Sequence, residues 1–261
     1  MEQCIYLGID GCKFGWWAWS IEDGRMTGGL FSGLEALLSQ YDQPIHCLID
    51  MPIGFSDSES PDRQCDKAAR RKLTKVKQSS IFPVPCRDAV YSDSYLQGCE
   101  LNMKEVGKKF SKQTWGIVPK IRELDEHLRR AEVGYNDVIR ESHPEVLFAQ
   151  LAGKPLETNK RTSEGRDERI ALLETLHPSL GKAVHQATNK TLRKHVMPDD
   201  IIDALVLCMA SQSALHLTRL PDKADYDRYG NCREIVYPKS FSLPEIEQIV
   251  LMEEPFETQM P

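Results

Sequence analysis

Two short apolar runs, each ending in an aspartate, most strongly constrain what this chain can fold into. Residues 5–9 precede Asp10-Gly11, and residues 45–49 precede Asp50-Met51-Pro52. A nearly continuous apolar run of five residues is typical of a strand that is buried on both faces, because a strand with one face in water alternates apolar and polar residues. We therefore expect a sheet covered by helices on both sides, with an acid at the end of at least two strands.

The other patterns predict three strands in a meander, followed by strands that alternate with helices. Asp23-Gly24 is a dipeptide favoured in tight hairpin turns, and it separates two strand-like segments. The further expected strands cover residues 16–21, 26–31, 136–142 and 234–237. The expected helices cover residues 34–41, a segment after Ser60-Pro61-Asp62, residues 115–132, 145–151 and 168–176, and a buried helix from Pro198 onward. This order predicts an α/β fold with a mixed sheet.

The domain organisation follows from the spacing of these elements and from the charge. We expect one main domain over residues 1–220, with residues 55–135 inserted between the fourth and fifth strands. Residues 221–261 hold four basic and nine acidic residues and are expected to form an acidic extension. Residues 61–122 hold fourteen basic and six acidic residues. That excess fits either a surface that binds a polyanion or the solvated faces of helices.

The composition excludes several classes of protein. With 41% hydrophobic and 28% charged residues, the chain is close to the globular average. It has no apolar stretch of about 20 residues, as a membrane span requires, and its first residues do not resemble a signal peptide. We expect a soluble, cytoplasmic protein that does not enter a membrane. The eight cysteines show no C-x-x-C spacing, so we expect free thiols rather than disulfides or structural zinc.

Five acids are the candidates for chemistry. Asp10, Asp50 and Glu141 fall at the carboxyl ends of expected strands, where ligands of open α/β sheets collect. Asp200 and Asp203 are three residues apart, on one face of the first turn of the buried helix. A carboxylate in an apolar environment costs several kcal/mol unless it is paired or bound to a metal.

The sequence places no lysine or arginine beside Asp50 or Asp203. Converging carboxylates raise one another's pKa unless a cation lies among them. A hard cation such as Mg²⁺ or Mn²⁺ suits such a site, and two ions about 4 Å apart can activate water and stabilise a leaving oxygen in phosphodiester cleavage. Each acid also has a structural alternative: Asp10 in a turn, Asp50 as a strand-end cap and Asp200 as a helix cap. Asp203 fits the capping alternative least well.

Five short motifs, in a fixed order along the chain, resemble those of a known protein family. They are GIDGCK at residues 8–13, IDMPIG at 49–54, SSIFP at 79–83, ESHPE at 141–145 and DIIDA at 200–204. The order of the acids resembles the ribonuclease H-like fold, especially its RuvC-like nucleases. Over residues 5–215 the motifs resemble the family called domain of unknown function 429, whose members are described as predicted ribonuclease H-like nucleases.

The resemblance implies a ribonuclease H-like mixed sheet flanked by helices, with a helical insertion after the fourth strand. It implies that Asp10, Asp50 and Asp203 bind Mg²⁺ or Mn²⁺ and that Asp200 or Glu141 completes the catalytic set. The implied activity is hydrolysis of a phosphodiester bond by two metal ions, with a nucleic acid or nucleotide as the partner. This chain departs from typical RuvC-like enzymes at Asp50, where they carry a glutamate, which is longer by one methylene.

Several polar residues are candidates for substrate binding, because cations and hydroxyl groups suit phosphate. They are Lys13, Ser79, Ser80, Arg87, Lys112, Lys120 and Arg122. For the lysines and arginines, solvation of a helix or of the surface is the alternative. His143 is a candidate general base, and its alternative is a structural residue at a strand end.

Two rival functions remain open at this point. One is an ATP-dependent kinase or phosphotransferase with an actin-like fold, in which an Asp-Gly turn also approaches phosphates. The other is a non-catalytic protein that binds nucleic acid or nucleotide.

Overall fold

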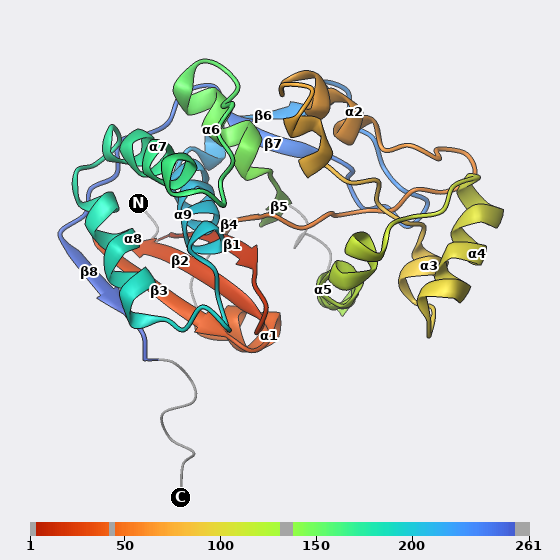
Figure 1. The fold of residues 1–261 in the computed structure, drawn as a ribbon, viewed down its shortest axis with the longest axis horizontal. Helices are drawn as coiled ribbons and strands as arrows, with labels where there is room; N and C mark the ends of the chain where they lie inside the picture. The colour runs from red at the N-terminus through yellow and green to blue at the C-terminus, as the bar shows by residue number, and fades with distance from the viewer. Residues whose placement is uncertain (1–3, 42–44, 131–137, 254–261) are drawn as a thin grey trace, which may run out of the picture.

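The computed structural model describes residues 4–41, 45–130 and 138–253. Within them, six strands form one mixed sheet in the order β5-β4-β1-β2-β3-β8 (Figure 1). The strands are β1 (Ile5–Gly11), β2 (Trp16–Glu22), β3 (Arg25–Phe31), β4 (Ile45–Ile49), β5 (Ile139–Glu141) and β8 (Gln248–Leu251). Strands β1, β2 and β3 form the antiparallel meander, while β4 runs parallel to β1 and β5 parallel to β4. The expected α/β fold with a ribonuclease H-like mixed sheet is confirmed.

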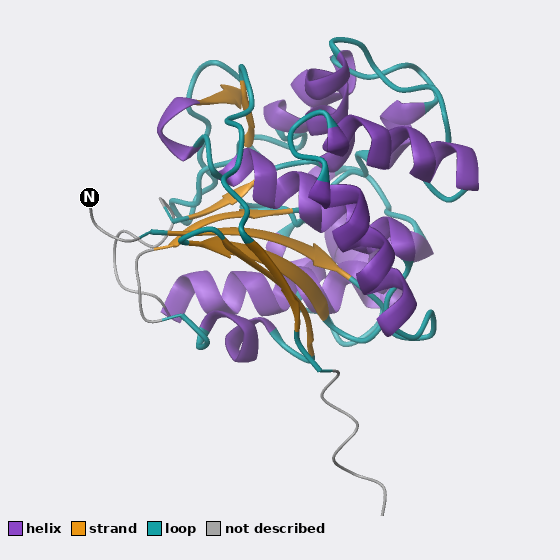
Figure 2. Cartoon of the chain, turned by 90° about the vertical axis from the view of Figure 1, so that its left-hand side faces the viewer, coloured by secondary structure: helices purple, strands orange, loops and turns teal. Residues whose placement is uncertain are grey.

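Helices cover both faces of this sheet (Figure 2). On one face lie α6 (Pro144–Ala152), α7 (Ser163–Glu174), α8 (Ser179–Lys190) and α9 (Pro198–Ser211). On the other lie α1 (Leu34–Leu38) and α5 (Lys112–Arg130). The remaining elements are α2 (Gln64–Arg71), η1 (Lys77–Ser80), α3 (Arg87–Val90), α4 (Tyr95–Val106), η3 (Ala214–His216) and a two-stranded sheet of β6 (Leu217–Leu220) and β7 (Ile235–Pro238).

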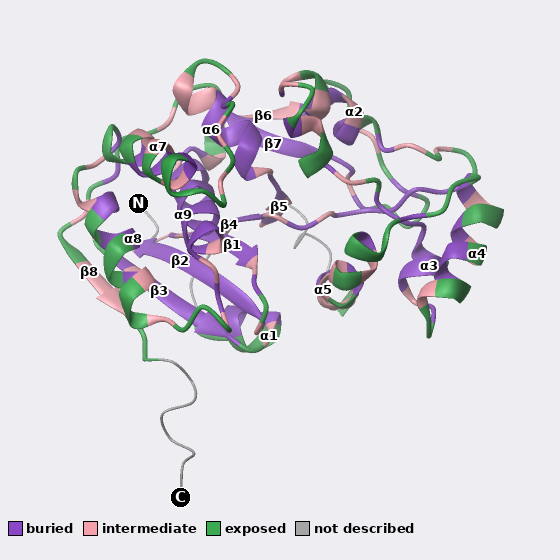
Figure 3. Ribbon diagram, viewed as in Figure 1, coloured by how far each residue is buried: buried purple, intermediate pink, exposed green. Residues whose placement is uncertain are grey.

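The central strands divide their side chains between two apolar cores. Leu7 and Ile9 of β1 pack on the α5 side, as does Ile49 of β4, whereas Leu48 packs on the α9 side. Both faces of these strands are therefore buried, and the strands show almost entirely as buried ribbon (Figure 3). This double burial explains the continuous apolar runs in the sequence.

Helix α9 lies directly on the backbone of β1, and Gly8 permits this contact. A Cβ atom at Gly8 would lie 2.1 Å from the backbone nitrogen of Cys208 and 2.2 Å from the carbonyl oxygen of Ala204. Trp19 of β2 also holds the helix, since its Nε1 donates a hydrogen bond of 3.0 Å to the carbonyl oxygen of Ile201. The result is that the first turns of α9 are fixed over the carboxyl end of β1.

Helices α2 to α5 lie between β4 and β5, where the sequence predicts an insertion. Helices α4 and α8 are not among the sequence predictions, and α7 begins at Ser163, before the start of the helix expected over residues 168–176. Part of the expected fifth strand and the end of the acidic extension lie outside the described residues.

The segment after residue 220 is part of the fold. Its strand β8 joins the main sheet beside β3, while β7 pairs with β6 in the small separate sheet. The described part of the acidic segment thus packs with the main domain. The boundary expected at residue 220 stays a prediction.

All eight cysteines are described and are free thiols, as the scattered spacing predicts. Among the described residues, no helix combines the length and the apolar character needed to cross a bilayer.

The close contact at Gly8 leads to a testable prediction. Gly8→Ala should lower the free energy of unfolding by about 1 to 3 kcal/mol, because the new methyl group meets helix backbone that cannot move independently. Urea denaturation measures the change.

Gly116→Ala is the matched control. Gly116 lies on the exposed side of α5, and a Cβ atom there would meet no atom within 4 Å. This variant should be more stable by about 0.5 to 1 kcal/mol, because alanine favours the helix. Equal stability of the two variants would contradict the packing argument.

Candidate metal centre

The register of two parallel strands places Asp10 beside Asp50. Ile9 of β1 pairs with Ile49 of β4, and the backbone N–H of Asp50 donates a hydrogen bond of 3.0 Å to the carbonyl oxygen of Ile9. Side chains two residues apart point to the same face of a strand, so Asp10 shares the α9 face with Gly8. Asp50 shares it with Leu48 in the same way. Both acids therefore leave the sheet toward α9.

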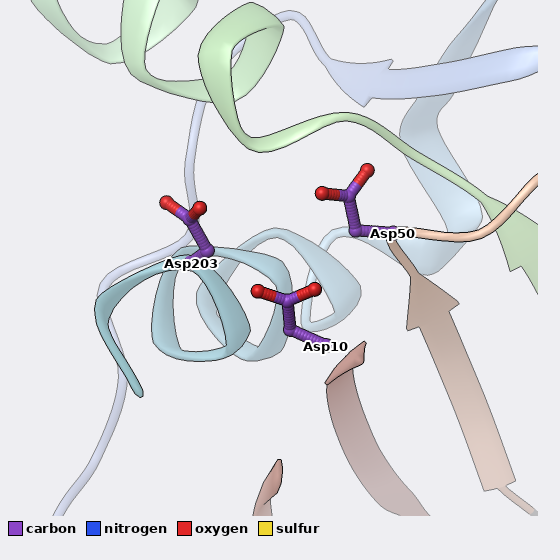
Figure 4. Close-up of side chains that lie close together, drawn as sticks. All are labelled: Asp10, Asp50 and Asp203. Atoms are coloured by element: carbon purple, nitrogen blue, oxygen red, sulfur yellow. The ribbon is translucent and has the colours of Figure 1, made fainter. Parts of the chain in front are cut away.

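Asp203 completes the group from the second turn of α9. One carboxylate oxygen from each of Asp10, Asp50 and Asp203 lies within 4.8 Å of the others. The three side chains face a common space between the strand ends and the helix (Figure 4). The shorter side chain of Asp50 thus reaches the group, although typical RuvC-like enzymes carry a glutamate there.

Burial and mutual repulsion shape the electrostatics of this group. Only 7% of Asp10 and 1% of Asp203 is exposed. Burial raises the pKa of Asp10 well above its usual range, and the charges of Asp50, Asp200 and Asp203 raise it further. Burial also raises the pKa of Asp203, to about 6, although Lys160 opposes the shift. The metal-free protein therefore stabilises the protonated forms of Asp10 and Asp203.

Lys160 is the cation that the sequence did not place beside the acids. It lies 43 residues before Asp203, in the loop between α6 and α7, and its ammonium group donates a hydrogen bond to Asp203 Oδ2. Burial disfavours the charge on Lys160, but Asp203, Asp10 and Asp50 outweigh that effect and raise its pKa. The sequence signal that could have revealed Lys160 is the basic loop between α6 and α7. Helix α6 begins directly after β5, so the loop that follows it returns toward the carboxyl ends of the strands.

The other two predicted catalytic acids have protein partners of their own. Asp200 caps α9, since its Oδ2 accepts a hydrogen bond of 2.9 Å from the backbone N–H of Met197, and burial raises its pKa to about 7. Glu141 accepts hydrogen bonds from Arg63 and from the backbone N–H of Ile53. Burial raises the pKa of Glu141 to about 7, although Arg63 opposes this. Neither acid is in the three-acid group.

Among the predicted substrate-binding residues, Ser80 and Lys120 line a cavity of about 160 Å³ that also contains Asp10 and Asp50. The Lys120 ammonium lies 5.2 Å from the centroid of the Trp16 ring. Ser79, Lys13 and Lys112 are exposed. Ser79 also donates a hydrogen bond of 2.9 Å to the carbonyl oxygen of Val76.

The two predicted arginines bind protein groups instead. Arg87 donates two hydrogen bonds of 2.8 Å to Asp125, and Arg122 donates to the carbonyl oxygens of Val90 and Ser92. His143 caps α6, because its Nδ1 accepts a hydrogen bond from the backbone N–H of Glu145 at 3.2 Å. The structure thus places these three residues in structural contacts, and His143 also lines the 160 Å³ cavity.

The donor set suits a divalent cation. Three carboxylates face one ammonium group, so the group carries an excess of negative formal charge when ionised. Among the described residues, Lys160 is the ion-pair partner of Asp203, and no ion pair or hydrogen bond reaches the carboxylates of Asp10 and Asp50. Hard oxygen donors with surplus negative charge are the ligands that Mg²⁺ and Mn²⁺ prefer. The residues present therefore fit such an ion.

The raised pKa of Asp10 predicts how the stability of the metal-free protein depends on pH. A carboxyl group whose pKa is raised by folding stabilises the folded state while it is protonated, and this contribution is lost as pH rises through the folded pKa. Asp10→Asn should therefore leave stability nearly unchanged at pH 4. At pH 8 it should raise the free energy of unfolding by on the order of 1 to 3 kcal/mol.

Urea denaturation in a chelator at pH 4, 6 and 8 measures this difference. Asp167→Asn, which changes an exposed acid of α7, is the control and should show no such rise. A constant difference between Asp10→Asn and wild type across this range would contradict the electrostatic description of the site.

A family model named "Protein of unknown function (DUF429)" matches residues 8–225. The match includes Asp10, Asp50 and Asp203. No curated protein and no solved structure matches the chain. The match covers most of the chain, so the protein belongs to the DUF429 family.

Proposed function

We propose that this protein hydrolyses a phosphodiester bond in a nucleic acid or nucleotide, with Mg²⁺ or Mn²⁺ held by Asp10, Asp50 and Asp203. The observation that carries the proposal is the convergence of three carboxylate oxygens within 4.8 Å from two strand ends and one helix. Converging, desolvated acids destabilise a fold unless a cation offsets their charge. A site that lowers stability is typical of a functional site.

A bound divalent ion would supply Lewis acidity and a water of lowered pKa, which are the needs of phosphodiester hydrolysis. The chain itself supplies the three carboxylates and two nearby cations. Lys160 donates one hydrogen bond to Asp203, and an ammonium group has three donors. Lys120 lines the cavity that contains Asp10 and Asp50. Both lysines can therefore orient an anionic phosphate against the carboxylates.

The three-acid group is the proposed primary ion site. A second ion, as a two-metal mechanism requires, would have to draw on Asp200 or Glu141. Each of these already accepts a hydrogen bond from the protein, from Met197 and from Ile53 respectively. Burial raises the pKa of both Asp200 and Glu141 to about 7. Either side chain can therefore exchange protons near neutral pH.

Asp10→Asn should abolish both metal binding and cleavage. The amide keeps the shape of the side chain but removes a charged ligand, so we expect at least about a 100-fold loss of kcat, as is usual when electrostatic stabilisation of a transition state is removed. The measurement is cleavage of labelled single-stranded and duplex DNA, RNA and hybrids with Mg²⁺ or Mn²⁺. Calorimetric titration with the metal alone gives the second readout.

Asp167→Asn is the matched control and should retain metal binding and cleavage. Full activity of Asp10→Asn would refute the proposed site. Saturable ATP binding without cleavage by the wild type would favour a phosphotransferase. If Mg²⁺ and Mn²⁺ neither bind nor stabilise the wild type, the non-catalytic alternative gains support.

Lys160→Gln should separate metal affinity from catalysis. Removing the ammonium takes away a competing cation, so we expect Mn²⁺ to bind about tenfold more tightly, while kcat/KM falls because a phosphate contact is lost. Without metal, the variant should be less stable at pH 8 than the wild type, since Asp203 loses its ion-pair partner and the positive charge that offsets Asp10 and Asp50 is removed. Calorimetry, steady-state kinetics and urea denaturation measure these three effects.

Lys154→Gln removes an exposed lysine from the same loop and is the control for this variant. It should match the wild type in all three measurements. If Lys160→Gln weakens Mn²⁺ binding, Lys160 supports the ion site rather than competing with it.

A further inference from the structure

Two cavities of different chemistry lie next to the three-acid group. The first, of about 160 Å³ and called the apolar cavity below, has Asp10 and Asp50 in its wall together with the charged residues Arg63, Asp66, Lys120 and Glu141 and several apolar residues. Those apolar residues include Ile81, Phe82, Val84 and Ile117. The second cavity, of about 430 Å³, is lined mainly by polar and charged residues. They include Lys77, Ser79, Gln113, Asn159, Lys160 and Arg161.

The three carboxylates lie between these cavities. Asp10 and Asp50 line the apolar cavity, whereas Lys160, which binds Asp203, lines the polar one. Ser80 belongs to both walls, so the cavities are adjacent. A phosphate at the carboxylates would therefore have the more apolar cavity on one side and, on the other, a polar cavity whose lining includes Lys160 and Arg161 as well as Glu145 and Glu157.

The size of the apolar cavity limits what can enter it. Sites for drug-sized ligands have volumes of about 300 to 1,000 Å³, and this cavity is smaller than that range. The cavity has room for one planar ring system. It has no room for a duplex, because the major groove of a duplex alone is about 12 Å wide. A base can enter only when it is unpaired.

The walls of this cavity match an unpaired base. Phe82 is half-buried there, and bases that leave a helix stack on aromatic side chains. Arg63 also lines the cavity with only 1% of its surface exposed. Its guanidinium is held by Asp66, Glu141 and the carbonyl oxygen of Ile53, so it forms a fixed, planar part of the wall.

We infer that the apolar cavity binds one unpaired base, while the adjoining strand passes over the polar cavity beside Lys160 and Arg161. The substrate class is then a single-stranded nucleic acid or a small nucleotide diester, and duplex is excluded. This inference rests on the proposed function for the position of the phosphate, but the base pocket can be tested by binding alone.

The test is calorimetric binding of AMP, UMP and ribose 5-phosphate to the wild type with Mg²⁺. Both nucleotides should bind at least about tenfold more tightly than ribose 5-phosphate, since stacking of one base contributes about 1 to 3 kcal/mol. Ile117→Trp fills the cavity and Phe82→Ala removes its aromatic wall, so each variant should reduce this preference to below about threefold. Leu96→Trp, on an exposed position of α4, is the control and should keep the preference.

Equal binding of ribose 5-phosphate and the nucleotides would overturn the inference, and so would an unchanged preference in both folded variants. Absence of binding by all three probes would overturn it as well. Thermal unfolding shows whether each variant is folded, and Phe82→Ala keeps the test decisive if Ile117→Trp does not fold.

Cleavage separates this inference from the proposed function. Preference for nucleotides without any metal-dependent cleavage would refute hydrolysis and keep the base pocket. Equal cleavage of duplex and single strands, lost in Asp10→Asn, would keep hydrolysis and refute the base pocket. Cleavage confined to unpaired strands, lower in Ile117→Trp, supports both.

Discussion

The direct contact between α9 and β1 is the constraint on which the site depends. Without a side chain at Gly8, the helix backbone rests on the strand and Trp19 fixes it by a hydrogen bond to the carbonyl oxygen of Ile201. This contact brings the acid of the helix, Asp203, to the acids that end β1 and β4. The packing of α9 on β1 thus provides the free energy that holds the three carboxylates together. Their mutual repulsion is confined to the carboxyl ends of β1 and β4.

The acids around this end of the sheet differ in how their charge is balanced. Glu141 is bonded to Arg63, and Glu145 to Lys77 and Arg169, so these buried acids have fixed cationic partners. In the three-acid group, Lys160 is the one ion-pair partner that the described residues provide. Buried ion pairs fix neighbouring elements to one another, whereas a group with surplus charge calls for a ligand. This contrast distinguishes the candidate ion site from the networks beside it.

Local sequence patterns predicted the strands that end at Asp10 and Asp50, because double burial leaves a continuous apolar run and proline or glycine ends it. They also predicted Asp203, since capping does not explain an acid followed by Ala204-Leu205. They did not reveal Lys160 or Arg63, whose partners lie 43 and 78 residues away. Such contacts depend on how loops cross the sheet edge. Helix α8 was missed because its buried face is made largely of small residues, such as Gly181, Ala183 and Ala187, and β8 because it is a short apolar run among acids.

The basic excess of residues 61–122 also has a different meaning in the folded chain. Three of its cations, Arg63, Lys77 and Arg87, are buried and pair with Glu141, Glu145 and Asp125. The pairs with Glu141 and Glu145 fasten the segment between β4 and β5 to the rest of the protein, and the Arg87–Asp125 pair joins α3 to α5 within the segment. They are therefore not available to attract the phosphates of a long duplex, whose binding depends on many exposed cations. Other cations of the segment, such as Lys75, Lys104 and Lys109, are exposed, as expected for solvated helix faces. Under the proposed function, Lys120 and Lys160 are the lysines that lie beside the carboxylates and can contact a phosphate.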